Sequence, residues 1–348
     1  MSDSKLQLGS QDNTDLLSRV RTLLARRTEG RALALLAVVI IVTLFIEPTT
    51  FTSYEVTLGR IAQIGLVALG LTAVILMGEL DLAVASTLAV SGVIMASVEN
   101  MTGSLTLGIL AALVTGLVIG VVNAFFVVQV GINSFIATLG MLFFLRGLGF
   151  VLSGEQPVRL DNVDAGLAFG DPLIGPLTPR MLIFLVLFIG LQVFVTRIRV
   201  GREFYAVGGN RQAAYDAGIP VKARVYLGFM ISGSVAALAG VMNTLERTAA
   251  DPTAGSTVLL SSFAAAIIGG ILLTGGRGSV FGTLLGAASL GILQVALTLS
   301  GIQVDVQNII IGVVLLLAVT TDPATIRAVV TNVRSMMAGR ADARAQPG

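Results

Sequence analysis

The chain has 348 residues, of which 55% are hydrophobic and only 12% are charged, and its mean hydropathy is +0.91. Soluble domains carry about 25% charged residues, so this composition excludes an ordinary soluble protein and indicates an integral membrane protein. The sequence contains no histidine and no cysteine. It therefore excludes Ser-His-Asp triads, cysteine nucleophiles and zinc sites built on those residues.

The charged residues argue against two further classes of protein, Walker-type nucleotide hydrolases and nucleic-acid-binding proteins. The only lysines are Lys5 and Lys222, and neither follows a glycine. A Walker A loop requires Gly-Lys-Ser/Thr, so we expect no nucleotide hydrolysis by that route. We also expect no cofactor and no metal site. The net charge of +2 is too small to indicate a nucleic-acid partner.

Apolar segments along the chain predict an all-α, polytopic protein with the lipid bilayer as its solvent. A transmembrane helix needs about 20 apolar residues, with a range of about 17–25. We place ten spans at roughly 32–47, 58–78, 82–98, 105–128, 132–153, 181–197, 225–245, 258–273, 279–299 and 305–321. The membrane domain then covers 32–322, between an N-terminal segment at 1–31 and a tail at 323–348.

The arginines and lysines predict the orientation of these spans. They gather in 1–31, in the loop 198–224, near Arg277 and in 323–348. With ten spans, all four regions fall on one side, and the positive-inside rule makes that side cytoplasmic. We therefore expect both termini in the cytoplasm and a multi-pass protein of the inner or plasma membrane.

Small residues at a spacing of four predict close helix packing, because apolar side chains gain little by leaving lipid for one another. We expect contacts within one chain at Gly116 and Gly120, Ala236 and Gly240, and Gly282 and Gly286.

The loop 198–224 contains a short helix. Asn210 is a suitable N-cap, the helix runs from Arg211 to Ala217, and Gly218 ends it. Such a short helix is marginal alone, and we expect it to expose a small apolar face formed by Ala213, Ala214 and Ala217. Docking in a partner's groove and a simple capped linker are equally compatible with this pattern.

The order Gly-Gly-Asn-x-x-Ala-Ala-x-x-x-Gly-Ile at 208–219 resembles the coupling loop of ABC importer permeases, in the ribose-type sugar and branched-chain amino-acid permease superfamily. Three further segments resemble motifs of this family: Gly78-Glu-Leu-Asp-Leu-Ala-Val-Ala-Ser86, Phe135-Ile-Ala-Thr-Leu-Gly140 with Arg146-Gly147, and Gly275-Gly-Arg-Gly-Ser-Val-Phe-Gly-Thr283. The four motifs occur in the family's order, and the resemblance covers about 60 to 322.

The resemblance implies a homodimer of permeases, a separate ABC ATPase (two copies or one tandem fusion) and an extracytoplasmic solute-binding protein. It implies that 210–218 docks on the ATPase, which is the predicted role of Asn210, Arg211, Ala213, Ala214 and Gly218.

Polar residues at membrane depth are candidates for a translocation pathway, because burying them in lipid is costly. Glu79 and Asp81 lie in a short connection between the second and third spans. One interpretation places them at the inner surface in contact with water. The other makes this connection a broken helix whose end lines the pathway.

Asn133, Ser134 and Thr138 begin the fifth span, and the last two share a helix face. Their side chains suit an uncharged, hydroxyl-rich solute such as a sugar, or bond neighbouring helices. Arg146, inside the same span, snorkels outward or pairs with an acid such as Glu246.

The glycines around Arg277 predict a tight cytoplasmic turn rather than a dinucleotide fingerprint, because no strand precedes them and their spacing differs. Spans two to five and seven to ten have opposite topology, which suits an inverted repeat. The turns at 78–86 and 251–256 are equivalent in that repeat.

We interpret the chain as the permease subunit of an ABC importer for a monosaccharide of ribose or xylose type, and not as an enzyme. The alternatives are a branched-chain amino-acid or nucleoside permease of the same superfamily, an ion-coupled secondary transporter that uses Glu79 and Asp81, and a membrane-embedded enzyme.

Overall fold

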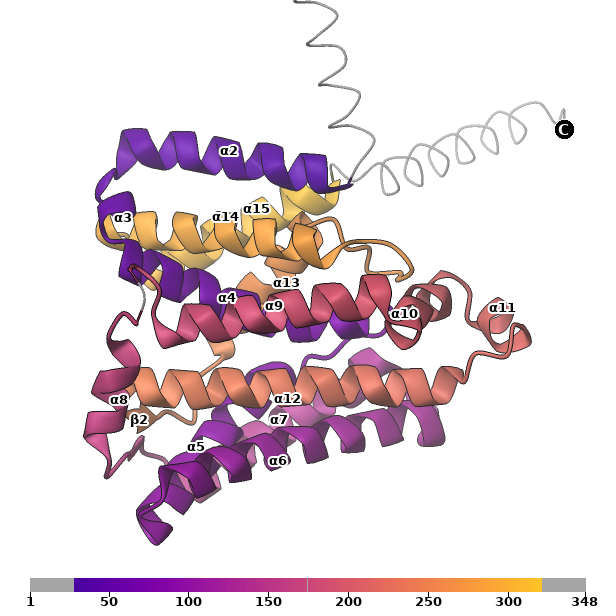
Figure 1. Cartoon of the computed structure of the whole chain (residues 1–348), viewed down its shortest axis with the longest axis horizontal. Helices are drawn as coiled ribbons and strands as arrows, with labels where there is room; N and C mark the ends of the chain where they lie inside the picture. Colours follow the sequence, from indigo (N-terminus) through magenta and orange to yellow (C-terminus); the bar gives the residue numbers. More distant parts are fainter. Residues whose placement is uncertain (1–27, 174, 321–348) are drawn as a thin grey trace, which may run out of the picture.

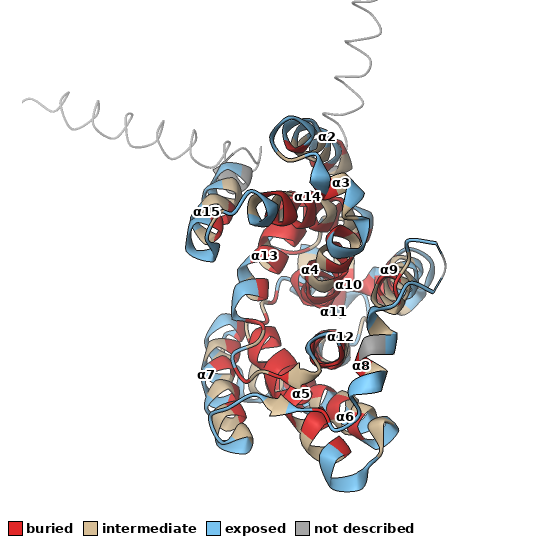
Figure 2. Cartoon of the chain, turned by 90° about the vertical axis from the view of Figure 1, so that its left-hand side faces the viewer, coloured by how far each residue is buried: buried red, intermediate tan, exposed pale blue. Residues whose placement is uncertain are grey.

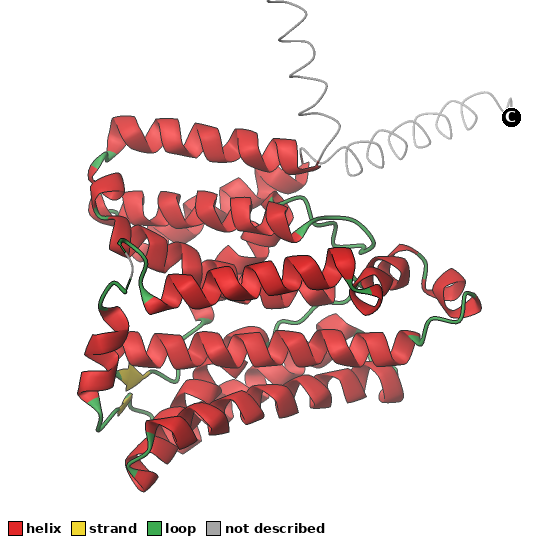
Figure 3. Ribbon diagram, viewed as in Figure 1, coloured by secondary structure: helices red, strands yellow, loops and turns green. Residues whose placement is uncertain are grey.

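The computed structural model describes residues 28–173 and 175–320, and almost every element in them is a helix (Figures 1 and 3). The first part of the chain forms α2 (Thr28–Ile46), α3 (Thr49–Thr52), α4 (Tyr54–Ile75), α5 (Val84–Thr102), α6 (Leu105–Phe125), the π-helix η1 (Phe126–Val130) and α7 (Ser134–Ser153). The second part forms β1 (Val158–Arg159), α8 (Val163–Gly170), α9 (Pro179–Arg197), α10 (Arg199–Gly209), α11 (Arg211–Asp216), α12 (Val221–Arg247), β2 (Ala249–Ala250), α13 (Ser256–Ile268), α14 (Val280–Leu299) and α15 (Val304–Thr320).

The predicted all-α, polytopic membrane architecture is confirmed. Each predicted apolar segment contains a helix, and 8 helices among the described residues are long and apolar enough to cross a membrane. The apolar helices at Ser256–Ile268 and Val304–Leu317 are shorter. The 13 residues of α13 rise about 20 Å, less than the roughly 30 Å of a bilayer core. The ten-span count and the cytoplasmic termini therefore stay predictions.

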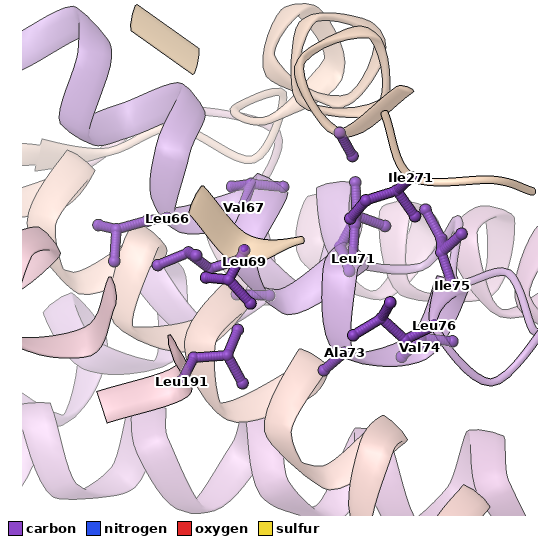
Figure 4. Packing of buried hydrophobic residues seen from close by; sticks show 14 of the residues in the cluster. Leu66, Val67, Leu69, Leu71, Ala73, Val74, Ile75, Leu76, Leu191 and Ile271 are labelled. Atoms are coloured by element: carbon purple, nitrogen blue, oxygen red, sulfur yellow. The ribbon is translucent and has the colours of Figure 1, made fainter. Parts of the chain in front are cut away.

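Helices α4 and α12 lie at the centre of the bundle. In Figure 2, α2, α13, α14 and α15 lie on one side of this pair and α5, α6 and α7 on the other. Helix α4 is buried on nearly all sides, as expected for a helix that is apolar all round. Its leucines, isoleucines and valines form much of the cluster in Figure 4, where Leu191 of α9 and Ile271 join them.

The small residues pack helices of this chain against one another, as predicted. A Cβ atom added at Gly116 of α6 would stand 2.3 Å from the carbonyl oxygen of Gly233 in α12. One added at Gly240 would stand 2.2 Å from the carbonyl oxygen of Leu88, and one at Gly286 would stand 2.0 Å from that of Ala265. Glycine is therefore required where these helix pairs approach most closely.

The two ends of the bundle differ. At one end lie α3, α8 and the two-stranded antiparallel pair β1–β2, in which Val158 pairs with Ala250 (Figure 1). The other end carries α10, α11, the turn at 269–279, the start of α2 and the end of α15 (Figure 1). The basic loop 198–224 and Arg277 thus lie at the same end of the bundle. This agrees with the expectation that these basic regions fall on one side of the membrane.

The turns proposed as equivalent in an inverted repeat come into contact. A Cβ added at Gly255, just before α13, would stand 2.4 Å from the carbonyl oxygen of Ala85, near the start of α5. The repeat itself stays a prediction.

Candidate functional site

The site centres on the connection between α4 and α5, residues 76–83, which we call the link. It is not helical: Gly78 adopts φ +76°, a backbone conformation that side-chain-bearing residues rarely take. Glu79 is 6% exposed and Asp81 is 1% exposed. Of the two interpretations of these acids, the one that leaves them in contact with water at the inner surface is contradicted, because both side chains are buried in the bundle. The predicted break in the helix is present.

Asp81 lies in a buried polar cluster. Its Oδ2 accepts a hydrogen bond from Ser232 Oγ of α12 at 2.8 Å, and its Oδ1 accepts one from the Ala83 backbone N–H at 3.1 Å. Asn123 Nδ2 of α6 lies 3.5 Å from Oδ1, while Asn123 Oδ1 is buried without a hydrogen-bond partner among the described residues. Within the described part of the chain, Asp81 has no cationic partner. Acids buried this way in membrane proteins mark functional sites.

Two hydroxyl groups of α7 hold the backbone of the link. Ser134 Oγ accepts a hydrogen bond from the Leu80 N–H, and Thr138 Oγ1 accepts one from the Leu82 N–H, both at 3.1 Å. Thr138 Oγ1 also donates to the Ser134 carbonyl oxygen at 2.7 Å. The predicted shared face of Ser134 and Thr138 therefore packs on the link and supplies hydrogen bonds that its non-helical backbone lacks.

Asn133 does not join this cluster. It is exposed and caps α7, where its Oδ1 accepts a hydrogen bond from the Phe135 N–H at 3.0 Å. The structure thus brings together Glu79, Asp81, Ser134 and Thr138 of the predicted pathway residues and leaves Asn133 at the edge.

The short helix of the loop 198–224 is present as α11. Asn210 Oδ1 accepts a hydrogen bond from the Ala213 N–H at 3.0 Å, which confirms the predicted N-cap. Gly218 adopts φ +78°, and the Ile219 N–H bonds the Ala214 carbonyl at 3.0 Å, so the helix ends in a left-handed cap. The helix ends at Asp216, one residue before the predicted position.

The predicted exposed face of α11 needs a correction. Ala213 and Ala217 are exposed, but Ala214 is only 4% exposed and packs in the main apolar cluster. Tyr215, which the sequence analysis did not single out, is 68% exposed. Ala214 therefore anchors α11 to the bundle, while Ala213, Tyr215 and Ala217 face outward.

Arg211 of α11 forms an ion pair with Glu79 of the link. The Glu79 side chain is 8% exposed and that of Arg211 is 54% exposed, so the pair reaches from the surface into the bundle. No sequence pattern predicted this contact. The signals for it in the sequence were an acid in the link without an evident partner and an excess of cations on the same predicted side.

Of the two alternatives for Arg146, pairing with Glu246 is not found. Glu246 of α12 instead accepts a hydrogen bond from Arg180 Nη1 of α9 at 2.6 Å, and Arg146 forms no ion pair with another described residue. The turn around Arg277 has the predicted form, because Gly275, Gly276 and Gly278 all have positive φ.

The fold and these contacts define a polytopic membrane protein in which one surface helix is joined to a broken helix in the interior. A family model described as branched-chain amino acid transport system / permease component matches residues 53–319. The chain belongs to this family of transport permeases.

Curated relatives cover most of the chain. The ribose import permease protein of Escherichia coli (strain K12) is 35% identical over 84% of this chain and 93% of the relative. The L-arabinose ABC transporter permease protein of Azospirillum brasilense is 34% identical over 75% of this chain and 77% of the relative. The D-allose transport system permease protein of E. coli (strain K12) is 33% identical over 74% and 79%. No solved structure matches the chain.

Proposed function

We propose that this chain is the permease subunit of an ATP-binding-cassette importer that carries a monosaccharide of ribose or xylose type. The relatives named above carry ribose, arabinose or allose in their names, at 33–35% identity over most of the chain. Sugars are uncharged and rich in hydroxyl groups, so an importer for them needs no buried counter-ion for its solute. A separate ATPase, an extracytoplasmic binding protein and a second copy of this chain complete the proposed assembly.

The exposure of α11 is the observation that supports the proposed docking of the ATPase on this helix. This helix is capped at both ends and anchored by Ala214, and it presents Ala213, Tyr215 and Ala217 to solvent. Tyrosine is one of the residue types enriched in interface hot spots, so the exposed Tyr215 suits a docking contact. The helix is fixed before the partner arrives, so docking loses little conformational entropy.

Co-purification tests this docking. The tagged chain is expressed together with a candidate ABC ATPase and extracted in mild detergent. Tyr215→Arg should reduce the recovered ATPase about tenfold, which corresponds to about 1.4 kcal/mol at an interface. Tyr54→Arg is the matched control, because Tyr54 is 45% exposed at the start of α4, away from α11. Equal recovery with both variants would remove the docking role.

Uptake into proteoliposomes tests the solute. Vesicles that contain the permease and ATPase receive the binding protein and one labelled solute outside, with ATP at the ATPase side. We expect ATP-dependent uptake of ribose, xylose, arabinose or allose, and none of leucine or a nucleoside. Uptake of leucine or a nucleoside alone would support the other branches of the superfamily.

The buried Asp81 is the observation that favours an ion-coupled transporter as the second candidate. Glu79 is neutralised by Arg211, whereas the contacts of Asp81 among the described residues are neutral donors. Uptake that persists without ATP and collapses with a protonophore would support this candidate. Uptake that needs ATP and survives the protonophore would support the importer.

A further inference from the structure

Three glycine-containing segments that are distant in sequence meet at the C-terminal end of α4. They are the link, the end of α10 and the turn between α13 and α14. Gly276 N–H donates a hydrogen bond to the Leu76 carbonyl oxygen at 2.9 Å. A Cβ added at Gly208 would stand 2.0 Å from that same oxygen, and one at Gly275 would stand 2.5 Å from the Gly78 nitrogen. We call Gly78, Gly208, Gly275 and Gly276 the glycine junction.

The contacts at the glycine junction are backbone to backbone. No side chain lies between Gly208 and Leu76, so no rotamer change is available to absorb a shift of one segment against the other. Close-packed contacts of this kind pass a displacement on instead of damping it. A movement of the end of α10 must therefore move the start of the link.

Helix α10 is itself held rigidly. Glu203 of α10 accepts hydrogen bonds from Arg224 Nε at the start of α12 at 2.6 Å and from Arg199 Nε at 3.0 Å. Gly201 approaches the Phe194 carbonyl of α9 so closely that a Cβ there would stand 2.1 Å away. Only Asn210 separates α10 from α11, so the two short helices and the junction form one mechanical unit.

A second contact joins α11 to the link directly. The ion pair of Arg211 with Glu79 has one nearly buried partner, so its loss leaves a charge without compensation in the interior, unlike the loss of a surface pair. On the far side of Glu79, the link bonds α7 through Ser134 and Thr138 and α12 through Asp81 and Ser232. The link therefore lies between α11 and the helices of the membrane domain.

We propose that the link is the relay that passes movement of α11 to α5, α7 and α12, with Glu79 and Arg211 as its positioning residues and the glycine junction as its pivot. This inference rests on the proposed function, since it needs an ATPase that moves α11. It assigns a common role to three motifs, Gly-Glu-Leu-Asp, Gly-Gly-Asn and Gly-Gly-Arg-Gly, that the docking of α11 does not explain.

The test measures solute uptake and ATP hydrolysis in the same proteoliposomes of the full complex. Glu79→Gln keeps the shape of the side chain and removes the charge, and its position inside the bundle keeps it out of reach of the ATPase. The relay predicts normal co-purification of the ATPase, continued ATP hydrolysis and a several-fold fall in solute carried per ATP. Glu246→Gln is the control, because it removes the acid of the ion pair with Arg180 at the C-terminal end of α12, away from α11 and the link.

Arg211→Gln and the double variant complete the test. If Glu79 and Arg211 act through one contact, the double variant should lose no more coupling than either single variant. A Glu79→Gln complex that assembles and carries solute per ATP at the wild-type ratio would overturn the relay. Independent, multiplying losses in the double variant would also overturn it. Failure of the wild-type chain to bind an ATPase would instead remove the proposed function, so the two failures are distinguishable.

Discussion

Ser232 Oγ donates a 2.8 Å hydrogen bond to Asp81 Oδ2 and thereby joins the link to α12 in the interior of the bundle. Both residues are fully buried, at 0% and 1% exposure. Their contact matters because Asp81 forms no ion pair with any other described residue. The carboxyl group depends on neutral donors, and the loss of any one of them removes a large share of its stabilisation.

Ser232→Ala should therefore lower the thermal midpoint of the purified protein by several degrees, because a buried acceptor without its donor costs about 1–3 kcal/mol. Ser289→Ala is the matched control: Ser289 is equally buried, but its hydroxyl bonds the Leu285 carbonyl of its own helix at 2.8 Å. Differential scanning fluorimetry in one detergent compares the two variants. Equal midpoints would show that the Asp81 contact contributes nothing specific.

Thr138→Val should reduce solute uptake while leaving ATPase co-purification unchanged. Valine keeps the volume of threonine but removes the hydroxyl, which accepts from the Leu82 N–H at 3.1 Å and donates to the Leu80 carbonyl at 3.4 Å. The link then keeps its bond to Ser134 of α7. Thr115→Val removes a hydroxyl that bonds only the Ala111 carbonyl in α6 and should keep wild-type uptake. Wild-type uptake in Thr138→Val would assign Thr138 to helix packing alone.

Gly208→Ala and Gly209→Ala should behave in opposite ways although the residues are neighbours. The Cβ of the first would stand 2.0 Å from the Leu76 carbonyl oxygen, while that of the second meets nothing within 4 Å. We expect a strongly reduced yield of monodisperse protein for Gly208→Ala and an unchanged yield for Gly209→Ala, since alanine favours a helix. Size-exclusion chromatography with a fluorescent fusion measures both, and a normal yield for Gly208→Ala would contradict the described contact.

Stability should fall in acid through Glu203. The hydrogen bond from Arg224 holds the pKa of Glu203 below 4.5, the ordinary value for glutamate. The pKa of Glu203 is lower in the folded state than in the unfolded state. Its contribution to stability is therefore complete above the unfolded-state pKa and is lost as the pH falls through the folded-state pKa. We expect the thermal midpoint to fall as pH drops below about 4.5 and expect Glu203→Gln to flatten that fall. An identical pH profile for the variant would exclude Glu203 as a cause.

Much of the fold could be read from local patterns. Apolar segments of suitable length marked every membrane-type helix, and Asn210 and Gly218 marked the ends of α11, because hydropathy and capping depend on residues a few positions apart. The pairs of small residues predicted contacts within the chain, because only glycine or alanine permits such approach. These properties belong to short stretches of sequence.

The contacts that make the candidate site were decided by tertiary structure. Glu79 and Arg211 are 132 positions apart, and Asp81 and Ser232 are 151 apart. No local rule pairs such residues, and Glu246 accordingly pairs with Arg180, whereas the sequence offered Arg146 as one alternative. The sequence pattern places Ala214 on an exposed face of a surface helix, but the packing of α11 against the bundle buries it. The sequence alone determined which segments are helical and membrane-embedded; only their packing decided which polar groups meet, because burial and distance depend on all the helices at once.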